Sequence, residues 1–271
     1  MSMLEKIKST ADYIRNAANF QPQVGIILGS GLGGLVKEIE TVKELNYADI
    51  PGFPVSTVKG HGSKLIFGKL NGVNVVAMQG RFHFYEGYSM DEVVLPVRVM
   101  KFLGIDKLIL SNASGGVNPK YKVGDLMILD DHINLMGTNP LIGKNEDELG
   151  PRFPDMGEPY DKKLIEKALS IAKKHNYTCH TGIYAAVTGP TFETRAEYKY
   201  IKFIGADCVG MSTVPENIIA RHMDMPVFAI SIITDLGGSD EPEFITHEEV
   251  LKVANAAEQK MTVIIKELIK E

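Results

Sequence analysis

The sequence predicts one α/β domain spanning residues 1–271, with a central mixed β-sheet flanked by helices. Three observations support this fold class. Strand-length apolar segments alternate with helix-length amphipathic segments, apolar residues make up 44% of the chain, and no repeat or composition break marks a domain boundary. In such folds function resides at the strand ends, so the turns that follow the strands are the places to search for a site.

The individual elements follow from hydrophobic periodicity and from capping and turn signals. In the first half we expect helices over 3–19 and 90–102 and strands over 24–28, 63–70, 73–78, 107–110 and 126–129. In the second half we expect helices over 161–174, 195–204, 214–222 and 247–269 and strands over 181–187, 207–210 and 227–233. The dipeptide Asn71-Gly72 predicts a tight hairpin turn. Residues 131–159, rich in Gly, Pro, Asn and Asp, predict a long functional loop.

Charge and cysteine content exclude several classes of partner. A net charge of −5 and a pI near 5.9 give no reason to expect nucleic acid or a membrane as partner. Cys179 and Cys208 are far apart and lack metal-ligand spacing, which predicts two buried thiols in a reduced, cytoplasmic protein. The N-terminal residues do not resemble a signal peptide, and the apolar run over 227–233 is too short to cross a bilayer. We expect no metal site.

The stretch QGRFHFYEGY at 79–88 is the most informative segment. Arg81, His83 and Tyr85 recur at a spacing of two, so in an extended backbone they share one face. Phe82 and Phe84 would point into the core. A guanidinium, an imidazole and a phenol on one face suit an oxyanion held beside a hydroxylated ligand, although an ordinary half-exposed strand has the same alternation.

The first glycine-rich turn, GSGLGG at 29–34, fits a dinucleotide-binding pattern. That pattern also requires an acidic residue at a strand end about twenty residues later. Asp49 lies near that position, but we expect a proline-bounded loop with no strand before it, so dinucleotide binding is disfavoured. The free amides of the turn, the start of the following helix and the Ser30 hydroxyl instead predict a phosphate cradle.

Further donors follow other strands. A second glycine-rich turn at 112–116 offers backbone amides near Ala113, and Ser212 and Thr213 lie between a strand and a helix. One of these two hydroxyls is expected to serve as a plain helix N-cap. Together with Ser30, Arg81 and His83, Ser212 would surround an oxyanion with donors from separate strand ends.

Candidates for holding a heterocycle lie later in the chain. Phe192 and Glu193 share one loop and would stack on and hydrogen bond to a ring, and Asp235 follows a strongly apolar strand. The plainer interpretation of the pair is a solvated acid beside a core phenylalanine. His61 and His247 are isolated histidines, which are more often structural than catalytic.

Five motifs in order resemble the trimeric purine nucleoside phosphorylases of low molecular mass. They are GSGLG at 29–33, GRFHFYEGY at 80–88, NASGG at 112–116, GPTFET at 189–194 and VGMSTVPE at 209–216. The resemblance runs from about residue 20 to residue 250. It implies a nucleoside phosphorylase-like fold, a cytoplasmic homotrimer and reversible phosphorolysis of purine nucleosides in salvage. It implies no cofactor, since inorganic phosphate is a co-substrate.

The resemblance also assigns roles by position. Phosphate would be bound by Ser30, His61, Arg81, His83, the amide of Ala113 and Ser212. Ribose would be bound by Tyr85, Met211 and His247, and the purine by Phe192, Glu193, Val209, Gly210 and Asp235. The catalytic groups would be His83, Glu193 and Asp235. Phe153 would close the site of a neighbouring subunit, which gives the long loop a function.

Asp235 departs from the family pattern, which has Asn at this position. An amide can donate to purine N7, whereas an ionised Asp can only accept. Either Asp235 is protonated in a buried site, or it accepts from a 6-amino group or a protonated N7. Methylthioadenosine phosphorylases carry Asp here, which makes an adenosine-type enzyme the alternative. Glu193 favours 6-oxopurines because a carboxylate suits their N1–H, and His247 favours a 5′-hydroxyl.

Two other classes of function remain open. A nucleotide-binding oxidoreductase rests on the first glycine turn alone. A non-catalytic purine-binding protein would retain Phe192 and Glu193 but would not need Arg81 and His83. Phosphate-dependent release of a free base separates a phosphorylase from both, and also from a hydrolytic nucleosidase.

Overall fold

The computed structural model describes residues 2–55, 62–237 and 245–270. The strands of the described residues are β1 (Val24–Ile27), β2 (Glu40–Asn46), β3 (Lys64–Leu70), β4 (Val73–Gln79), β5 (Lys107–Gly116), β6 (Leu126–Asn134), β7 (Cys179–Ala186), β8 (Cys208–Gly210) and β9 (Val227–Leu236). They form one mixed sheet in the order β2-β3-β4-β1-β5-β8-β7-β6-β9. Because β9 also pairs with β5, the strands from β5 to β9 close into a ring, and β1 to β4 extend from it.

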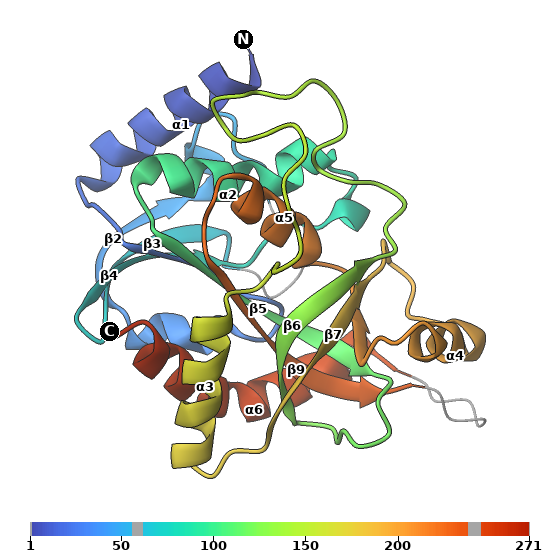
Figure 1. Cartoon of the computed structure of the whole chain (residues 1–271). Helices are drawn as coiled ribbons and strands as arrows, with labels where there is room; N and C mark the ends of the chain where they lie inside the picture. The colour runs from blue at the N-terminus through green and yellow to red at the C-terminus, as the bar shows by residue number, and fades with distance from the viewer. Residues whose placement is uncertain (1, 56–61, 238–244, 271) are drawn as a thin grey trace.

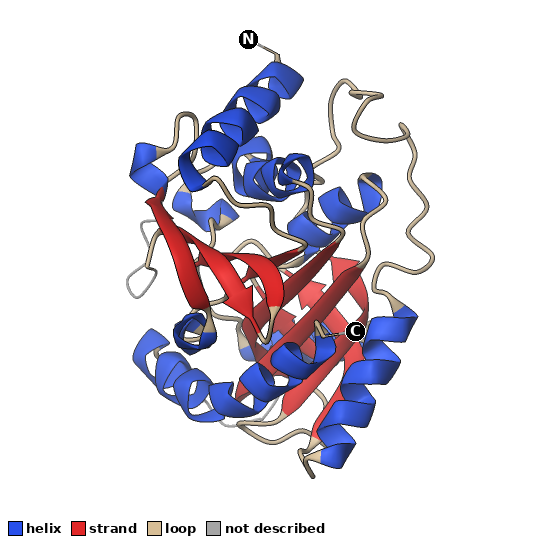
Figure 2. Cartoon of the chain, turned by 90° about the vertical axis from the view of Figure 1, so that its left-hand side faces the viewer, coloured by secondary structure: helices blue, strands red, loops and turns tan. Residues whose placement is uncertain are grey.

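Helices cover both sides of this sheet, as Figures 1 and 2 show. They are α1 (Met3–Ala18), α2 (Met90–Leu103), α3 (Lys162–Lys174), α4 (Arg195–Phe203), α5 (Val214–His222) and α6 (His247–Leu268). Helices α1, α2 and α5 pack together on one side, and α3 packs with α6 on the other. Helix α4 lies at one end of the molecule, next to β8.

Three strands meet around Gly115 of β5. Gly115 of β5 pairs with Val209 of antiparallel β8 and with Asp235 of parallel β9. The register of β5 and β9 shifts at this point, between Ser114 and Gly115. The bulge bends the strands and brings the polar ends of β5, β8 and β9 to one place.

The predicted α/β fold class is confirmed, and every helix and strand expected from periodicity is present with shifts of a few residues at its ends. The hairpin around Asn71-Gly72 also forms, with both residues at positive φ. The predicted strands were too short in three places, however. Strand β5 continues through the glycine-rich turn predicted at 112–116, β9 continues past residue 233 to Leu236, and β6 extends to Asn134.

One strand was missed. Residues Glu40–Asn46 form β2 at the sheet edge, directly before the 3₁₀ helix Tyr47–Asp49. The expectation of no strand before Asp49 was therefore wrong. The side chains of β2 are mostly exposed and include three charged residues, so this strand lacks the apolar alternation from which strands are predicted. Charged side chains of this kind are typical of an edge strand that is protected against pairing with other chains. β2 runs antiparallel to β3, far from β1, so it does not supply the second strand of a dinucleotide fold.

Candidate active site

One cavity lies at the strand ends. Of the residues expected in the site, it is lined by Ser30, Arg81, His83, Tyr85, Ala113, Phe192, Glu193, Val209, Gly210, Met211, Ser212, Asp235 and His247. These side chains come from the segments after β1, β4 and β8, from β5, β8 and β9, from the loop before α4, and from the start of α6. Residues more than 200 positions apart therefore share one surface, as the strand-end hypothesis requires.

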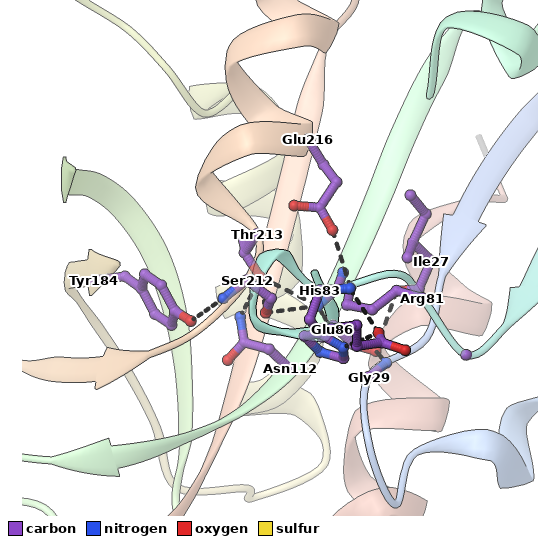
Figure 3. Close-up of polar contacts among 12 residues, drawn as sticks. Ile27, Gly29, Arg81, His83, Glu86, Asn112, Tyr184, Ser212, Thr213 and Glu216 are labelled. Carbon is purple, nitrogen blue, oxygen red and sulfur yellow. Dashed lines mark hydrogen bonds and ion pairs between the residues drawn. The ribbon is translucent and has the colours of Figure 1, made fainter. Parts of the chain in front are cut away.

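Arg81 is the centre of a buried network at one end of the cavity (Figure 3). Its Nη1 donates to the carbonyl oxygen of Ser111 and to Ser212 Oγ, both at 2.9 Å. Its Nε lies 3.0 Å from Glu216 Oε1, and both side chains are almost fully buried. The carboxylate compensates the buried guanidinium and fixes its plane, so the cation is held in place before any ligand arrives.

His83 and Tyr85 continue this end of the cavity. The two rings stack with centroids 4.7 Å apart. The backbone remains extended at His83, but Tyr85 lies in a short 3₁₀ helix, Phe84–Glu86, so the expected single extended face is only partly correct. Phe82 is buried against Tyr47, as expected of the core side. The polar side chains still line one cavity because the 3₁₀ helix places the Tyr85 ring against the imidazole of His83.

Glu86 positions His83. Its Oε1 accepts from the His83 amide at 2.8 Å and lies 3.2 Å from Nδ1. Burial lowers the pKa of His83, and the hydrogen bond to Glu86 opposes that shift. When Nδ1 donates to Glu86, Nε2 of the neutral ring can only accept, which suits the P–OH of hydrogen phosphate.

The first glycine turn contributes less than expected. Ser30 and Gly29 line the cavity, but the start of the following 3₁₀ helix, Gly33–Glu38, does not. The amides of Gly34 and Leu35 donate to Glu258 Oε1 of α6 at 2.5 and 3.3 Å. A carboxylate of the chain itself occupies the anion position at this helix start, so the helix start is not part of a phosphate cradle.

The hydroxyls of Ser212 and Thr213 do not cap α5. Thr213 occupies the N-cap position at φ 72° and makes no capping hydrogen bond, so the N-cap interpretation was wrong. Its Oγ1 accepts from Asn112 Nδ2 at 2.9 Å, and Asn112 Oδ1 in turn accepts from Ser231 at 2.6 Å. A left-handed backbone is unfavourable for threonine, and the buried hydroxyl network holds it there.

The other end of the cavity is acidic. Asp235 Oδ1 accepts from Thr234 Oγ1 at 2.9 Å, and its Oδ2 accepts from the Tyr198 hydroxyl at 3.1 Å. The Tyr198 hydroxyl also lies close to the Glu193 carboxyl. Burial raises the pKa of Glu193, and the nearby Asp235 adds to the increase. Hydrogen bonds from the Glu193 backbone and from Tyr198 oppose it.

The remaining predicted residues form the walls or lie elsewhere. Met211 and His247 also line the cavity, and so does Phe192, which is 39% exposed. Phe153 is 86% exposed and lines a separate hollow with Arg152 and Met156. His61 lies outside the described residues.

Sequence reasoning missed the residues that hold the others. A predicted side chain is contacted by Glu216, Glu86, Thr213 and Tyr198, and Asn112 in turn holds Thr213. Four of them lie inside the recognised motifs, and this position was the sequence signal that could have identified them. The fifth, Tyr198, lies on α4 beyond the motif at 189–194, and no sequence feature connects it with Asp235. Among the described residues, no cluster of three His, Cys, Asp or Glu side chains could hold a metal ion.

Comparison with known proteins agrees with this geometry. The profile of the phosphorylase superfamily matches residues 23–270. Purine nucleoside phosphorylase 1 of Bacillus subtilis is 51% identical over 267 residues, which cover 98% of each chain. Solved structures of purine nucleoside phosphorylase from Schistosoma mansoni with inosine and with adenosine each superpose with a TM-score of 0.94 at 40% identity. Each covers 100% of this chain, and the matched share of the other chain is 98% for the inosine complex and 99% for the adenosine complex. The chain therefore belongs to the phosphorylase superfamily and, within it, to the purine nucleoside phosphorylases, which are pentosyltransferases.

Proposed function

We propose that this phosphorylase acts on 6-oxopurine nucleosides such as inosine and guanosine, with inorganic phosphate as co-substrate. The products would be a free purine for salvage and ribose or deoxyribose 1-phosphate. One observation carries the proposal: a single cavity has donors held around Arg81 at one end and the Glu193 carboxylate at the other. A nucleoside placed along it would face phosphate with its ribose and Glu193 with its base.

The phosphate end would be formed by Ser30, His61, Arg81, His83, the Ala113 amide and Ser212. Tyr85, Met211 and His247 would contact the ribose, with His247 at the 5′-hydroxyl. This assignment is supported by the shared cavity, which all of these residues within the described part of the chain line together. Burial raises the pKa of Tyr85 to about 12, so its phenol stays a hydrogen-bond donor at neutral pH.

The chemistry would proceed without a covalent enzyme intermediate. As the bond between C1′ and N9 breaks, its electron pair moves to the purine and positive charge develops on the ribose. A phosphate oxygen then forms the new bond to C1′, while the phosphate charge stabilises the sugar. Arg81 and the hydroxyls would orient phosphate for this attack, and a donor near N7 would stabilise the leaving base. Asp235 in its protonated form would be that donor.

The preference for 6-oxopurines rests on Glu193, because an ionised carboxylate accepts from their N1–H and has nothing to accept from N1 of adenine. The names of the relatives, which are purine nucleoside phosphorylases, do not favour the methylthioadenosine type. The Schistosoma mansoni enzyme has been crystallised with adenosine as well as with inosine, so a minor activity on 6-aminopurines fits this cavity too.

A homotrimer in the cytoplasm completes the proposal. Phe153 would insert beside the open end of a neighbour's cavity, and its large exposed surface supports this role. The two thiols, Cys179 and Cys208, form no disulfide in the structure; Cys208 is buried and Cys179 partly buried. Among the described residues, no helix is both long and apolar enough to span a membrane.

A substrate panel tests the proposed function. Inosine, guanosine, adenosine and methylthioadenosine are each incubated with the enzyme, with and without phosphate, and base release is followed by absorbance. We expect phosphate-dependent cleavage, fastest for inosine and guanosine. Rapid cleavage of methylthioadenosine with no turnover of inosine would contradict it, as would base release that does not require phosphate.

A further inference from the structure

Tyr198 lies behind the two acidic residues of the cavity. Tyr198 is 5% exposed, and its hydroxyl donates to Asp235 Oδ2 at 3.1 Å and lies close to the Glu193 carboxyl. Two glycines make room for this arrangement. A Cβ on Gly237 would lie 2.1 Å from the Tyr198 ring, and one on Gly115 would lie 2.7 Å from Asp235 Oδ2. The Tyr198 side chain, which projects from α4, therefore packs closely against β5 and against the residue that follows β9.

We propose that Tyr198 is a positioning residue that joins Glu193 and Asp235 into one hydrogen-bonded unit and so determines which purine edges the cavity accepts. This inference rests on the proposed function, in which Glu193 faces N1 of the base. It adds a residue that does not line the cavity and that makes the two carboxylates depend on each other.

The unit has a limited number of protons. A phenol carries one proton and can direct it to one carboxylate at a time, while it accepts only from a carboxyl that is protonated. Burial and the two nearby carboxylates raise the pKa of Tyr198, so the phenol keeps its proton. When a 6-oxopurine donates its N1–H to Glu193, the phenol is free to donate to Asp235. A 6-aminopurine lacks that proton, so Glu193 must itself be protonated to donate to N1.

Base preference should therefore depend on pH. The groups facing Glu193 are Tyr198 and Glu197 of α4 and Asp235 of β9. Burial and the two carboxylates raise the pKa of Glu193, and the Tyr198 hydrogen bond lowers it. As pH falls through the raised pKa, Glu193 takes up a proton, so binding of 6-oxopurines weakens and that of 6-aminopurines improves. Removal of the phenol hydroxyl should raise the pKa further, which moves this change to higher pH.

Tyr198→Phe tests the proposal, with Tyr200→Phe, an exposed tyrosine of the same helix, as the matched control. The dissociation constants of hypoxanthine and adenine are measured by calorimetry across the acid range. Loss of a hydrogen bond to a charged group should move the acid limb for hypoxanthine upward by about one pH unit in Tyr198→Phe and leave Tyr200→Phe unchanged. Melting temperatures confirm that both variants fold.

Two outcomes would overturn the proposal. One is a Tyr198→Phe profile that superimposes on those of the wild type and of Tyr200→Phe. The other is strict additivity of the pH shifts caused by Tyr198→Phe and Asp235→Asn, since members of one unit are expected to be coupled. Base binding requires no turnover. Failure of the wild type to cleave inosine would thus contradict the proposed function, but the pH dependence of base binding would still test the role of Tyr198.

Discussion

The two ends of the active-site cavity differ in how their buried charged groups are stabilised. At the phosphate end, Arg81 is 1% exposed, and its charge is matched by Glu216 and fixed by a carbonyl and hydroxyls of the protein. At the base end, two carboxyl groups, Glu193 and Asp235, lie close together beside the phenol of Tyr198. The first end is preorganised for an anion. The second can change its proton content with the ligand it receives.

Loss of Arg81 should produce the largest effect. Arg81→Ala leaves the buried Glu216 carboxylate without its cation, so the free energy of unfolding should fall by about 3–5 kcal/mol, and phosphate use should be lost. Urea denaturation measures the first effect and phosphorolysis the second. In the control, Arg81→Met combined with Glu216→Leu, stability should largely return while activity does not. An Arg81→Ala variant as stable as the wild type would show that the pair does not hold this end together.

Much of the phosphate end could be predicted from the sequence because its ligating residues follow strands directly. Strand ends can be predicted from local patterns, and just beyond three of them, the ends of β1, β4 and β8, lie Ser30, Arg81, His83 and Ser212. The partners that hold these residues in place are harder to predict from the sequence. Glu216 and Glu258 act on partners more than a hundred positions away, at Arg81 and Gly34, and their effect depends on how the helices pack.

The base end was harder to predict for the same physical reason. Phe192, Glu193 and Asp235 were identified as candidates, but their convergence depends on the bulge between β5 and β9 and on two glycines that admit Tyr198. Strand β9 also continues through Asp235, beyond the end at residue 233 that its apolar run predicted. A buried sheet can continue through polar residues when hydroxyls satisfy one another, as Ser114 and Ser231 do at 2.5 Å.

A smaller effect is expected where the base end opens to solvent. Phe153→Ala should raise the KM for inosine by about tenfold, through loss of the aromatic contact that the neighbouring subunit would supply, with little change in the melting temperature. Phe203→Ala removes an equally exposed aromatic ring and serves as the control. Sedimentation of both variants reports the trimer. Equal KM values for the two variants would remove Phe153 from the account and leave the base end complete within one subunit.

The division of the cavity into a phosphate end and a base end is tested most directly by two-substrate kinetics on Arg81→Lys and Glu193→Gln. Lysine keeps the charge but not the fork of donors, so the KM for phosphate should rise by about tenfold while that for inosine changes little. Glu193→Gln should do the reverse, because it replaces the charged acceptor for N1–H with a weaker, neutral amide oxygen. Equal changes in both KM values in either variant would contradict the division.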